Sequence, residues 1–492
     1  MPPVPEVRIA RCNTMPLNVN GDFVLYWMVA FRRTGWNFSL QRAVEWCVEL
    51  KKPLLVFEPL RAGYGWASDR FHRFIIDGMA ANSERLKKSK AAYYPYVEPT
   101  ADAGKGLLAA LAQRACLVVT DDYPAFFIPS MISAASGSLP LLIEKVDGNG
   151  LLPMSVADSV FTGAQFFRRF LQKELAPHLA SMPEPDPLKQ KMLPDPIMIP
   201  KAVLKKWPPV SPELLRGGPK TLSALPINHQ VSPVERTGGS KEGLKTLKGF
   251  IESKLAVYPE NRNHPDDDAT SGLSPYLHFG HISVHEIFRH LADKEGWTPQ
   301  HLSKKVTGGR AGWWRMSEAA EAFLDELVTW REIGFNMCRR NGDYARYDSL
   351  PDWALKTLNQ HSKDKRRYLY SLEAFETATT HDPLWNAAQT QLLLEGRIHN
   401  YMRMVWGKKI LEWTPSPRQA LDVMIELNNK YALDGRDPNS YTGIFWCLGR
   451  YDRAWGPERP IFGKIRYMSS ENTIRKLRID EYLEKYRPSI HS

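Results

Sequence analysis

The chain lacks the features that mark membrane, secreted and metal-binding proteins. No apolar run approaches the roughly 20 residues of a membrane-spanning helix, and the proline-containing first twenty residues hold no apolar core for a signal peptide. Only five cysteines occur, without a CxxC pair or a metal-ligand spacing. The sequence therefore predicts a cytoplasmic protein with reduced thiols, no membrane segment and no bound metal.

Length and positive charge are what the chain has in plenty. Its 492 residues exceed what one hydrophobic core usually supports, so two domains are expected. Sixty-five basic residues against fifty-four acidic ones leave a net charge of +11. This excess favours an anionic partner such as a nucleic acid, and a merely soluble basic protein is the alternative.

Short apolar runs alternate with helical patterns over residues 21–175. Strand candidates lie at 23–28, 53–57, 117–120 and 141–143, and helix candidates near 40–50 and 69–88. This alternation predicts an α/β domain with a doubly wound parallel sheet. Such sheets bind ligands beyond the carboxyl ends of their strands. No GxGxxG fingerprint follows a strand, so the pattern points only weakly to a dinucleotide.

A proline-rich segment follows this first region. Twelve of the thirty-seven prolines lie between Met182 and Pro233, and proline at this density removes backbone donors and blocks regular ladders. We assign residues 176–240 to an interdomain connector, with a disordered linker as the alternative. From 241 to 492 apolar residues recur three or four apart, as in 323–335 and 392–413, which predicts an all-α domain.

Tryptophan is concentrated in the helical half, which holds ten of the fifteen between Trp297 and Trp455. Trp406 and Trp413 are seven residues apart and share one helix face. Trp385 precedes them in Asp382-Pro383-Leu384-Trp385-Asn386. Three indoles so spaced come within reach of one another, and close aromatic rings can carry an electron.

The segment Thr270–Gly280 places small hydroxyl and glycine residues before an apolar helix. Such a start exposes backbone N–H groups to an anion and suits a diphosphate. Taken alone, the segment favours an ordinary helix cap.

Together with four further motifs, this segment resembles the class II cyclobutane pyrimidine dimer photolyases. The other motifs are Trp330-Arg331-Glu332, the Asp382–Asn386 run, Leu433–Asn439 and Gly463–Met468, and the match runs in order from about Tyr258 to Met468. The resemblance implies a photolyase/cryptochrome fold, with an antenna domain at 21–175 and a helical FAD-binding catalytic domain at 241–492. It also implies a monomer in which photoexcited, reduced FAD passes an electron to a flipped pyrimidine dimer in UV-damaged DNA.

The same resemblance assigns FAD contacts by position within the motifs. Arg403 and Asp434 match a pair beside the flavin ring, for which a purely structural salt bridge is the alternative. Asn428 matches the residue that faces flavin N5, and Asn429 lies one position away. The full set of matched flavin contacts is Tyr258, Ser271, Gly272, Leu273, Ser274, Arg403, Asn428 and Asp434.

Lesion, DNA and electron-transfer residues are assigned in the same way. The residues that match dimer contacts are Glu326, Trp330, Met404 and Trp446, which with Asn428 form the catalytic set. Those that match basic residues at the DNA surface are Arg262, Arg453 and Arg466. The matched order of electron carriers, from flavin to solvent, is Trp406, Trp385 and Trp413.

Departures from the family pattern follow two N-terminal strands, at 29–33 and 121–127. We therefore expect an antenna chromophore, 8-hydroxy-5-deazaflavin or folate, to bind weakly or not at all. Residues 296–317 are longer than the usual connection. A solvated insertion is the favoured interpretation of this segment, and an extra DNA-contacting loop is the alternative.

A blue-light photoreceptor of the cryptochrome kind, without repair activity, is the competing function. Retention of the four dimer-contact residues favours repair.

Overall fold

The computed structural model describes residues 1–217 and 221–488, and the chain divides into two compact units. Unit 1 comprises Met1–Ala157, Glu174–Lys248 and Leu273–Pro299, and unit 2 comprises Asp158–Lys173, Gly249–Gly272 and Gln300–Ser492. The described part of the proline-rich segment is therefore grouped with unit 1. Among the described residues, no helix combines the length and apolarity needed to cross a membrane.

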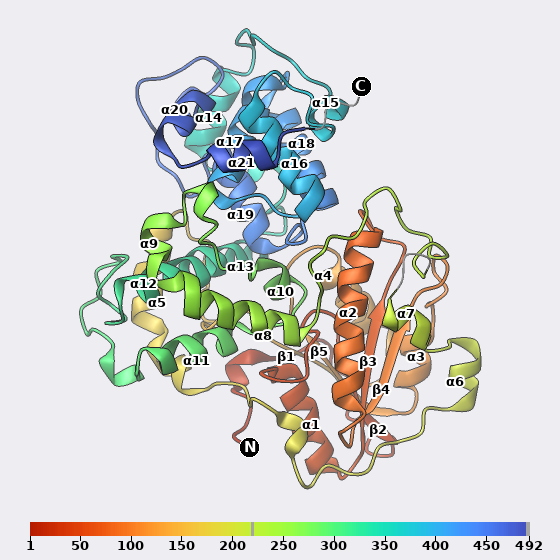
Figure 1. Cartoon of the computed structure of the whole chain (residues 1–492). Coiled ribbons are helices and arrows are strands. Elements are labelled where there is room, and N and C mark those ends of the chain that lie inside the picture. Colours follow the sequence, from red (N-terminus) through yellow and green to blue (C-terminus); the bar gives the residue numbers. More distant parts are fainter. Residues whose placement is uncertain (218–220, 489–492) are drawn as a thin grey trace. The chain divides into compact units, whose positions relative to one another are not determined.

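Unit 1 is built on a six-stranded sheet with the order β1-β6-β5-β2-β3-β4 (Figure 1). Four neighbouring pairs run parallel, and only β1 is antiparallel, to β6. The strands are β1 (Ile9–Arg11), β2 (Phe23–Trp27), β3 (Leu54–Leu60), β4 (Ala92–Val97), β5 (Ala115–Asp121) and β6 (Ile143–Val146). The doubly wound parallel sheet predicted from the sequence is confirmed. Its strand order changes direction between β2 and β5, where sheets of this kind bind ligands.

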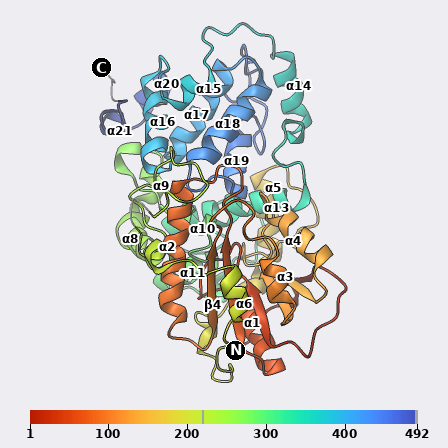
Figure 2. The same cartoon turned by 90° about the vertical axis from the view of Figure 1, so that its right-hand side faces the viewer.

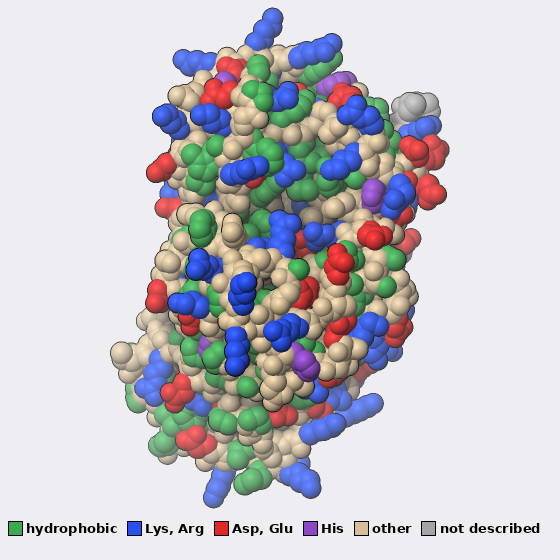
Figure 3. Space-filling model, turned by 90° about the vertical axis from the view of Figure 1, so that its left-hand side faces the viewer, with side chains coloured by type: hydrophobic (Ala, Val, Ile, Leu, Met, Phe, Trp, Pro, Cys, Tyr) green, Lys and Arg blue, Asp and Glu red, His purple; other side chains and the backbone are tan. Residues whose placement is uncertain are grey.

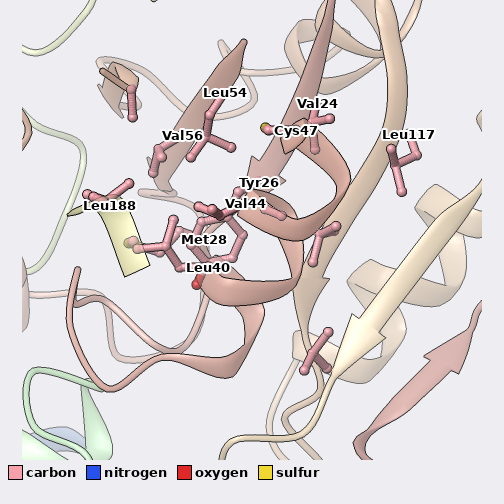
Figure 4. Packing of buried hydrophobic residues seen from close by; sticks show 14 of the residues in the cluster. Val24, Tyr26, Met28, Leu40, Val44, Cys47, Leu54, Val56, Leu117 and Leu188 are labelled. Carbon is pink, nitrogen blue, oxygen red and sulfur yellow. The ribbon is translucent and has the colours of Figure 1, made fainter. Parts of the chain in front are cut away.

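The central strands explain why the sheet forms where it does. Every residue of β2 and of β5 is buried, as expected of parallel strands covered on both faces. Helix α1 (Phe38–Leu50) begins after Asn37, whose side chain accepts a hydrogen bond from the Leu40 backbone N–H. Figure 4 shows Leu40 and Val44 of α1 packed beside Tyr26 of β2 in the buried core.

The remaining helices of unit 1 flank this sheet or follow it. They are α2 (Asp69–Leu86), α3 (Leu107–Ala112), α4 (Ile128–Ser138), α6 (Lys201–Lys206), α7 (Pro212–Arg216), α8 (Ser240–Gly249, ending in unit 2), α10 (Ser274–His278) and α11 (Val284–Lys294). Helix α1 contacts β2, β3, β5 and β6, and α2 contacts β3 and β4.

Unit 2 is helical, and its described residues contain no strand of a sheet. Its helices are α5 (Ala164–Glu174, ending in unit 1), α9 (Tyr258–Asn261), α12 (Glu318–Leu324), α13 (Arg331–Arg340), α14 (Asp352–Gln360), α15 (Leu372–Glu376), α16 (Pro383–Glu395), α17 (Asn400–Trp413), α18 (Pro417–Tyr431), α19 (Pro438–Cys447), α20 (Ser470–Lys476) and α21 (Asp480–Lys485). Helices α16, α17 and α18 run side by side (Figure 1 and Figure 2).

Two local features of unit 2 differ from a simple helical pattern. The stretch 392–413 forms two helices, because Gly396 ends α16 in the left-handed conformation with φ 65°. Between α12 and α13, the π-helical segment η8 (Asp325–Trp330) replaces the α-helical spacing. π-Helical insertions of this kind are frequent at functional sites.

Candidate functional site

At the sheet's switch point in unit 1, one buried carboxylate organises the loop that follows β2. Asp121, the last residue of β5, accepts hydrogen bonds from the backbone N–H groups of Val29, Ala30 and Phe31 at 2.8–2.9 Å. It also accepts one from the Tyr26 hydroxyl at 2.8 Å. The loop is thereby fixed by the sheet's own residues.

Aromatic side chains of the neighbouring loops of unit 1 contact one another. Phe126 lies against Phe127 with ring centroids 4.7 Å apart, against Tyr64 at 6.0 Å and against Trp66 at 6.1 Å. Two of these rings, Phe126 and Phe127, belong to the segment that departs from the family pattern. The loops after two strands of unit 1 thus contribute rings to one aromatic cluster.

In unit 2, the pair expected beside the flavin ring is formed. Arg403 of α17 donates through Nη2 to both carboxylate oxygens of Asp434, at 3.0 and 3.2 Å. The Nε–H of Arg403 is buried and donates to none of the described residues. A charged donor is therefore left over beside the ion pair.

Asn428 of α18 also has an unused polar atom. Its Nδ2 donates to Ser440 Oγ at 2.6 Å, while its buried Oδ1 accepts no hydrogen bond from the described residues. Neighbouring Asn429 differs, since its Nδ2 donates to the Tyr441 hydroxyl and its Oδ1 accepts from the Arg436 backbone N–H. The free amide oxygen distinguishes Asn428 from Asn429, a choice that rested on motif register in the sequence.

Two glycines let these elements approach closely. A Cβ on Gly435 would lie 2.7 Å from the Asn428 carbonyl oxygen, so the turn that carries Asp434 packs directly on α18. A Cβ on Gly407 would lie 2.5 Å from Cys447 Sγ, so the absence of a side chain at Gly407 makes room for the Cys447 side chain between α17 and α19. These contacts bring together the helices that carry Met404 and Trp446.

The three tryptophans form one contact series within unit 2. Trp385 is stacked on Trp406, with ring centroids 6.4 Å apart and planes 6° apart, and meets Trp413 edge-on at 6.1 Å. Its Nε1–H donates to the Trp406 carbonyl, and Trp406 Nε1–H donates to Gln389. All three rings are buried, with Trp385 touching both of the others.

Arg262, expected at the DNA surface, forms an ion pair with the expected dimer contact Glu326. Arg262 Nη1 lies 2.5 Å from Glu326 Oε1, and its guanidinium lies 5.4 Å from the Tyr258 ring centroid. Burial raises the pKa of Glu326, while the nearby Arg262 lowers it, with a net rise. Burial also raises the pKa of Tyr258, whose ring packs against Phe323.

The other two expected DNA residues join Trp446 in an alternating series of cations and rings. Arg466 lies 5.7 Å from the Trp446 ring and 4.9 Å from the Trp455 ring, and Arg453 lies 4.6 Å from Trp455. The Trp446 ring also contacts Lys408, whose Nζ lies 4.9 Å from the ring centroid. These distances permit cation–π attraction throughout the series.

Lys408 was not identified from the sequence. Its side chain is fully buried, and its Nζ donates to the Cys447 carbonyl at 2.7 Å. Burial lowers its pKa from the usual 10.5 to about 8. The only available signal was a lysine pair inside an apolar helix, which more often lies at a surface.

The four expected dimer contacts share a distinctive environment. Each is partly exposed, although most of its neighbours on the same elements are buried. For example, Trp330 ends η8 directly after buried Leu327, Val328 and Thr329. The set is Glu326, Trp330, Met404 and Trp446.

The expected phosphate loop spans the boundary of the two units. Ser271 and Gly272 belong to unit 2, whereas Leu273 and Ser274 belong to unit 1, where Ser274 begins α10. Gly272 has φ 66°, a left-handed conformation that glycine adopts without strain.

Comparison with solved structures identifies the fold. A class III photolyase from Agrobacterium tumefaciens matches with a TM-score of 0.67 and 19% identity, covering 95% of this chain and 86% of that one. A cryptochrome from Synechocystis matches with a TM-score of 0.66 and 16% identity, covering 94% and 88%. The fold is that of the photolyase/cryptochrome class.

Sequence comparison gives the family. The deoxyribodipyrimidine photo-lyase of Methanothermobacter thermautotrophicus is 35% identical over 486 residues, 98% of each chain. The chain belongs to the deoxyribodipyrimidine photo-lyase family. No protein-family model matches it.

Proposed function

We propose that this protein is a class II photolyase that uses light to split cyclobutane pyrimidine dimers in DNA. Family membership makes it a carbon–carbon lyase and implies FAD. The observation that carries the proposal is the partial exposure of Glu326, Trp330, Met404 and Trp446 on otherwise buried elements. Bound reduced FAD, once excited by light, supplies the electron that opens the cyclobutane ring and receives it back.

The residues of α17 and α18 fit a flavin. The leftover Nε–H of Arg403 and the leftover Oδ1 of Asn428 are a buried donor and a buried acceptor that the described residues do not satisfy. Buried polar atoms normally have partners. Arg403 would stabilise an anionic ring, Asp434 would orient the guanidinium, and Asn428 would hydrogen-bond at the ring without adding charge. Tyr258 and the Ser271–Ser274 loop stay predicted contacts on the phosphate side.

The lesion pocket offers flat apolar walls and one carboxyl group. Trp330 and Trp446 present rings to a flipped dimer, and Met404 adds an apolar side chain. In its protonated form, the Glu326 carboxyl group would donate a hydrogen bond to a dimer carbonyl oxygen. Such a bond contributes most when negative charge develops on that oxygen.

Arg262, Arg453 and Arg466 are proposed to face DNA. Their guanidinium groups attract phosphates, and the ring contacts of Arg466 and Arg453 hold both side chains beside Trp455. The ion pair of Arg262 with Glu326 supports a place at the lesion itself.

The tryptophan contacts support an electron path from Trp413 through Trp385 to Trp406. The central position of Trp385 is the supporting observation, because it touches both other rings. We further propose that no antenna chromophore binds, which is supported by the aromatic cluster of Phe126 and Phe127. The monomeric state, the cytoplasmic location and the domain boundaries stay predictions from the sequence.

The direct test illuminates chemically reduced protein mixed with an oligonucleotide that contains one thymine dimer. The expected result is dimer loss in near-UV or blue light and none in the dark. A photoreceptor without repair activity would bind FAD and leave the dimer intact in both conditions.

Glu326→Gln should lower repair per absorbed photon while FAD stays bound. The hydrogen bond to the developing anion is worth about 2–4 kcal/mol when it is removed altogether, and a glutamine amide that still donates should retain part of it. Glu318→Gln, an exposed change at the start of α12, is the matched control and should repair normally. Equal quantum yields for the two variants would remove Glu326 from the mechanism.

A further inference from the structure

The segment between α11 and α12 combines positive charge with an absence of acidic residues. Residues 300–317, here called the basic loop, contain no Asp or Glu. Their four cations, Lys304, Lys305, Arg310 and Arg315, are all exposed. Figure 3 shows Lys and Arg side chains gathered on the face that lies on the left in Figure 1, where α5 and α12 are labelled.

The basic loop is anchored on α5 by buried side chains. Gln172 Oε1 accepts from the backbone N–H groups of Thr307 and Gly308 at 3.1 and 2.8 Å, and Gln172 Nε2 donates to the Gly309 carbonyl at 3.0 Å. Arg168 Nη1 donates to the Gly308 carbonyl at 3.2 Å. The tip of the loop therefore has a defined conformation.

A second set of contacts anchors the loop on α12. The Glu321 carboxylate accepts from the backbone N–H groups of Gly312 and Met316. Ser303 N–H donates to the Trp313 carbonyl, which closes the loop on itself. The Trp313 ring is buried beneath the loop. A cavity of only about 20 Å³ lies between loop, α5 and η8, which is too small for an organic ligand.

The anchored loop leaves three of its four cations without an ion pair among the described residues. Lys304, Lys305 and Arg315 form no ion pair with any residue that the structure describes, and Arg310 approaches Asp325 only at 3.9 Å. Arg315 has φ 55°, a left-handed conformation in which a residue with a Cβ is strained and glycine would be expected. A loop that contacted only solvent would not require an arginine at this strained position.

The anchoring links the loop to the candidate lesion site. Arg168, which holds Gly308, also forms a bidentate pair with Asp325 at 2.7 and 3.0 Å. Asp325 immediately precedes Glu326 on η8. The same buried arginine thus fixes both the loop and the segment that carries a proposed dimer contact.

We propose that the basic loop is a second DNA-contacting element, which binds backbone phosphates beside the lesion. Phosphates complement a rigid cationic surface that lacks acidic residues. The inference rests on the proposed function for its partner. The sequence alone favours a solvated insertion for this segment, whereas the contacts of the loop favour DNA binding.

The test compares two variants with the same change in charge. The first carries Lys304→Gln, Lys305→Gln, Arg310→Gln and Arg315→Gln. The control carries Lys87→Gln, Lys88→Gln, Lys201→Gln and Lys205→Gln, which alters exposed lysines of unit 1. Affinities for an undamaged duplex and for the same duplex with one thymine dimer are measured at several salt concentrations, after thermal unfolding has shown that all proteins are folded.

The loop variant should bind both duplexes more weakly by the same factor, because phosphate contacts carry no sequence information. The slope of log affinity against log salt should become shallower by about 0.9 for each phosphate that the loop no longer neutralises. The control should keep the wild-type slope.

A wild-type slope in the loop variant, an equal change in the control, or a weakening confined to the dimer-containing duplex would each overturn the proposal. The proposed function is judged separately by the wild type. If the wild type does not prefer the dimer-containing duplex, that function fails, whereas the loop is still judged on the undamaged duplex.

Discussion

The two places where this fold offers a ligand site treat buried polar groups differently. At the carboxyl ends of β2 and β5, Asp121 satisfies three backbone N–H groups, and aromatic rings of an adjoining loop contact each other. On α17 and α18, Arg403 Nε and Asn428 Oδ1 are buried without a partner among the described residues. The backbone N–H groups of the loop after β2 are thus satisfied by the protein itself, whereas the two polar atoms on α17 and α18 are left for a ligand.

The largest effect is expected from removing the Asp121 carboxylate, which holds the loop after β2. Asp121→Ala leaves three buried N–H groups and the Tyr26 hydroxyl without their acceptor. The free energy of unfolding should fall by about 3–5 kcal/mol, since each unsatisfied group costs about 1–3 kcal/mol before relaxation. Urea unfolding measures it. Asp22→Ala, which removes a surface pair with Arg114, should cost less than about 1 kcal/mol; similar decreases for both would refute the comparison.

A second prediction concerns Lys408, the buried lysine of α17. The pKa of Lys408 is lowered from 10.5 to about 8, so the folded state binds fewer protons than the unfolded state between these pH values. Its contribution to stability therefore rises with pH across this window. At pH 7 Lys408→Met should be more stable than wild type by up to about 3 kcal/mol, at about 1.4 kcal/mol per pKa unit.

Above pH 10.5 this difference should disappear. The comparison is made between the two proteins at each pH, because Cys447, with a pKa raised to about 11, titrates in both. The groups that face Lys408 are Cys447, Asp452 and Arg466. A pH-independent difference would show that the pKa of Lys408 is the same in the folded and the unfolded protein.

Much of the fold followed from the sequence, and the omissions have physical causes. Strand β4 was missed because Pro95 interrupts Ala92–Val97, and proline is tolerated there only because β4 is an edge strand. The helical stretch 392–413 was expected without a break because the apolar spacing continues across Gly396. The π-helical spacing of η8 leaves no mark in a pattern judged by a period of 3.6.

The candidate site was predictable only in part. Motif positions named the pair Arg403 and Asp434, which the structure brings together. They gave no sign of the ion pair between Arg262 and Glu326, because a side chain's partner across 64 residues of sequence depends on packing. Lys408 was missed for the same reason.

The smallest predicted effect distinguishes two neighbouring residues of α18. Asn429→Ala removes the partners of Tyr441 and of the Arg436 N–H, and should lower the free energy of unfolding of the flavin-free protein by about 2–3 kcal/mol. Asn428→Ala removes the bond to Ser440 and a long one of 3.5 Å to Asn429, and should cost about 1 kcal/mol. Fluorescence titration with FAD should show the reverse order, with affinity weakened mainly by Asn428→Ala. Equal effects in both measurements would mean that Asn428 has no ligand.

The number and kind of chromophores bound per chain test most directly whether unit 2 binds FAD while unit 1 binds no antenna chromophore. The protein is purified from a host that makes both FAD and 8-hydroxy-5-deazaflavin, and the chromophores released on denaturation are counted by absorption. The account predicts one FAD per chain and no second chromophore. A second chromophore in equal amount, or a chain that takes up no FAD, would contradict it.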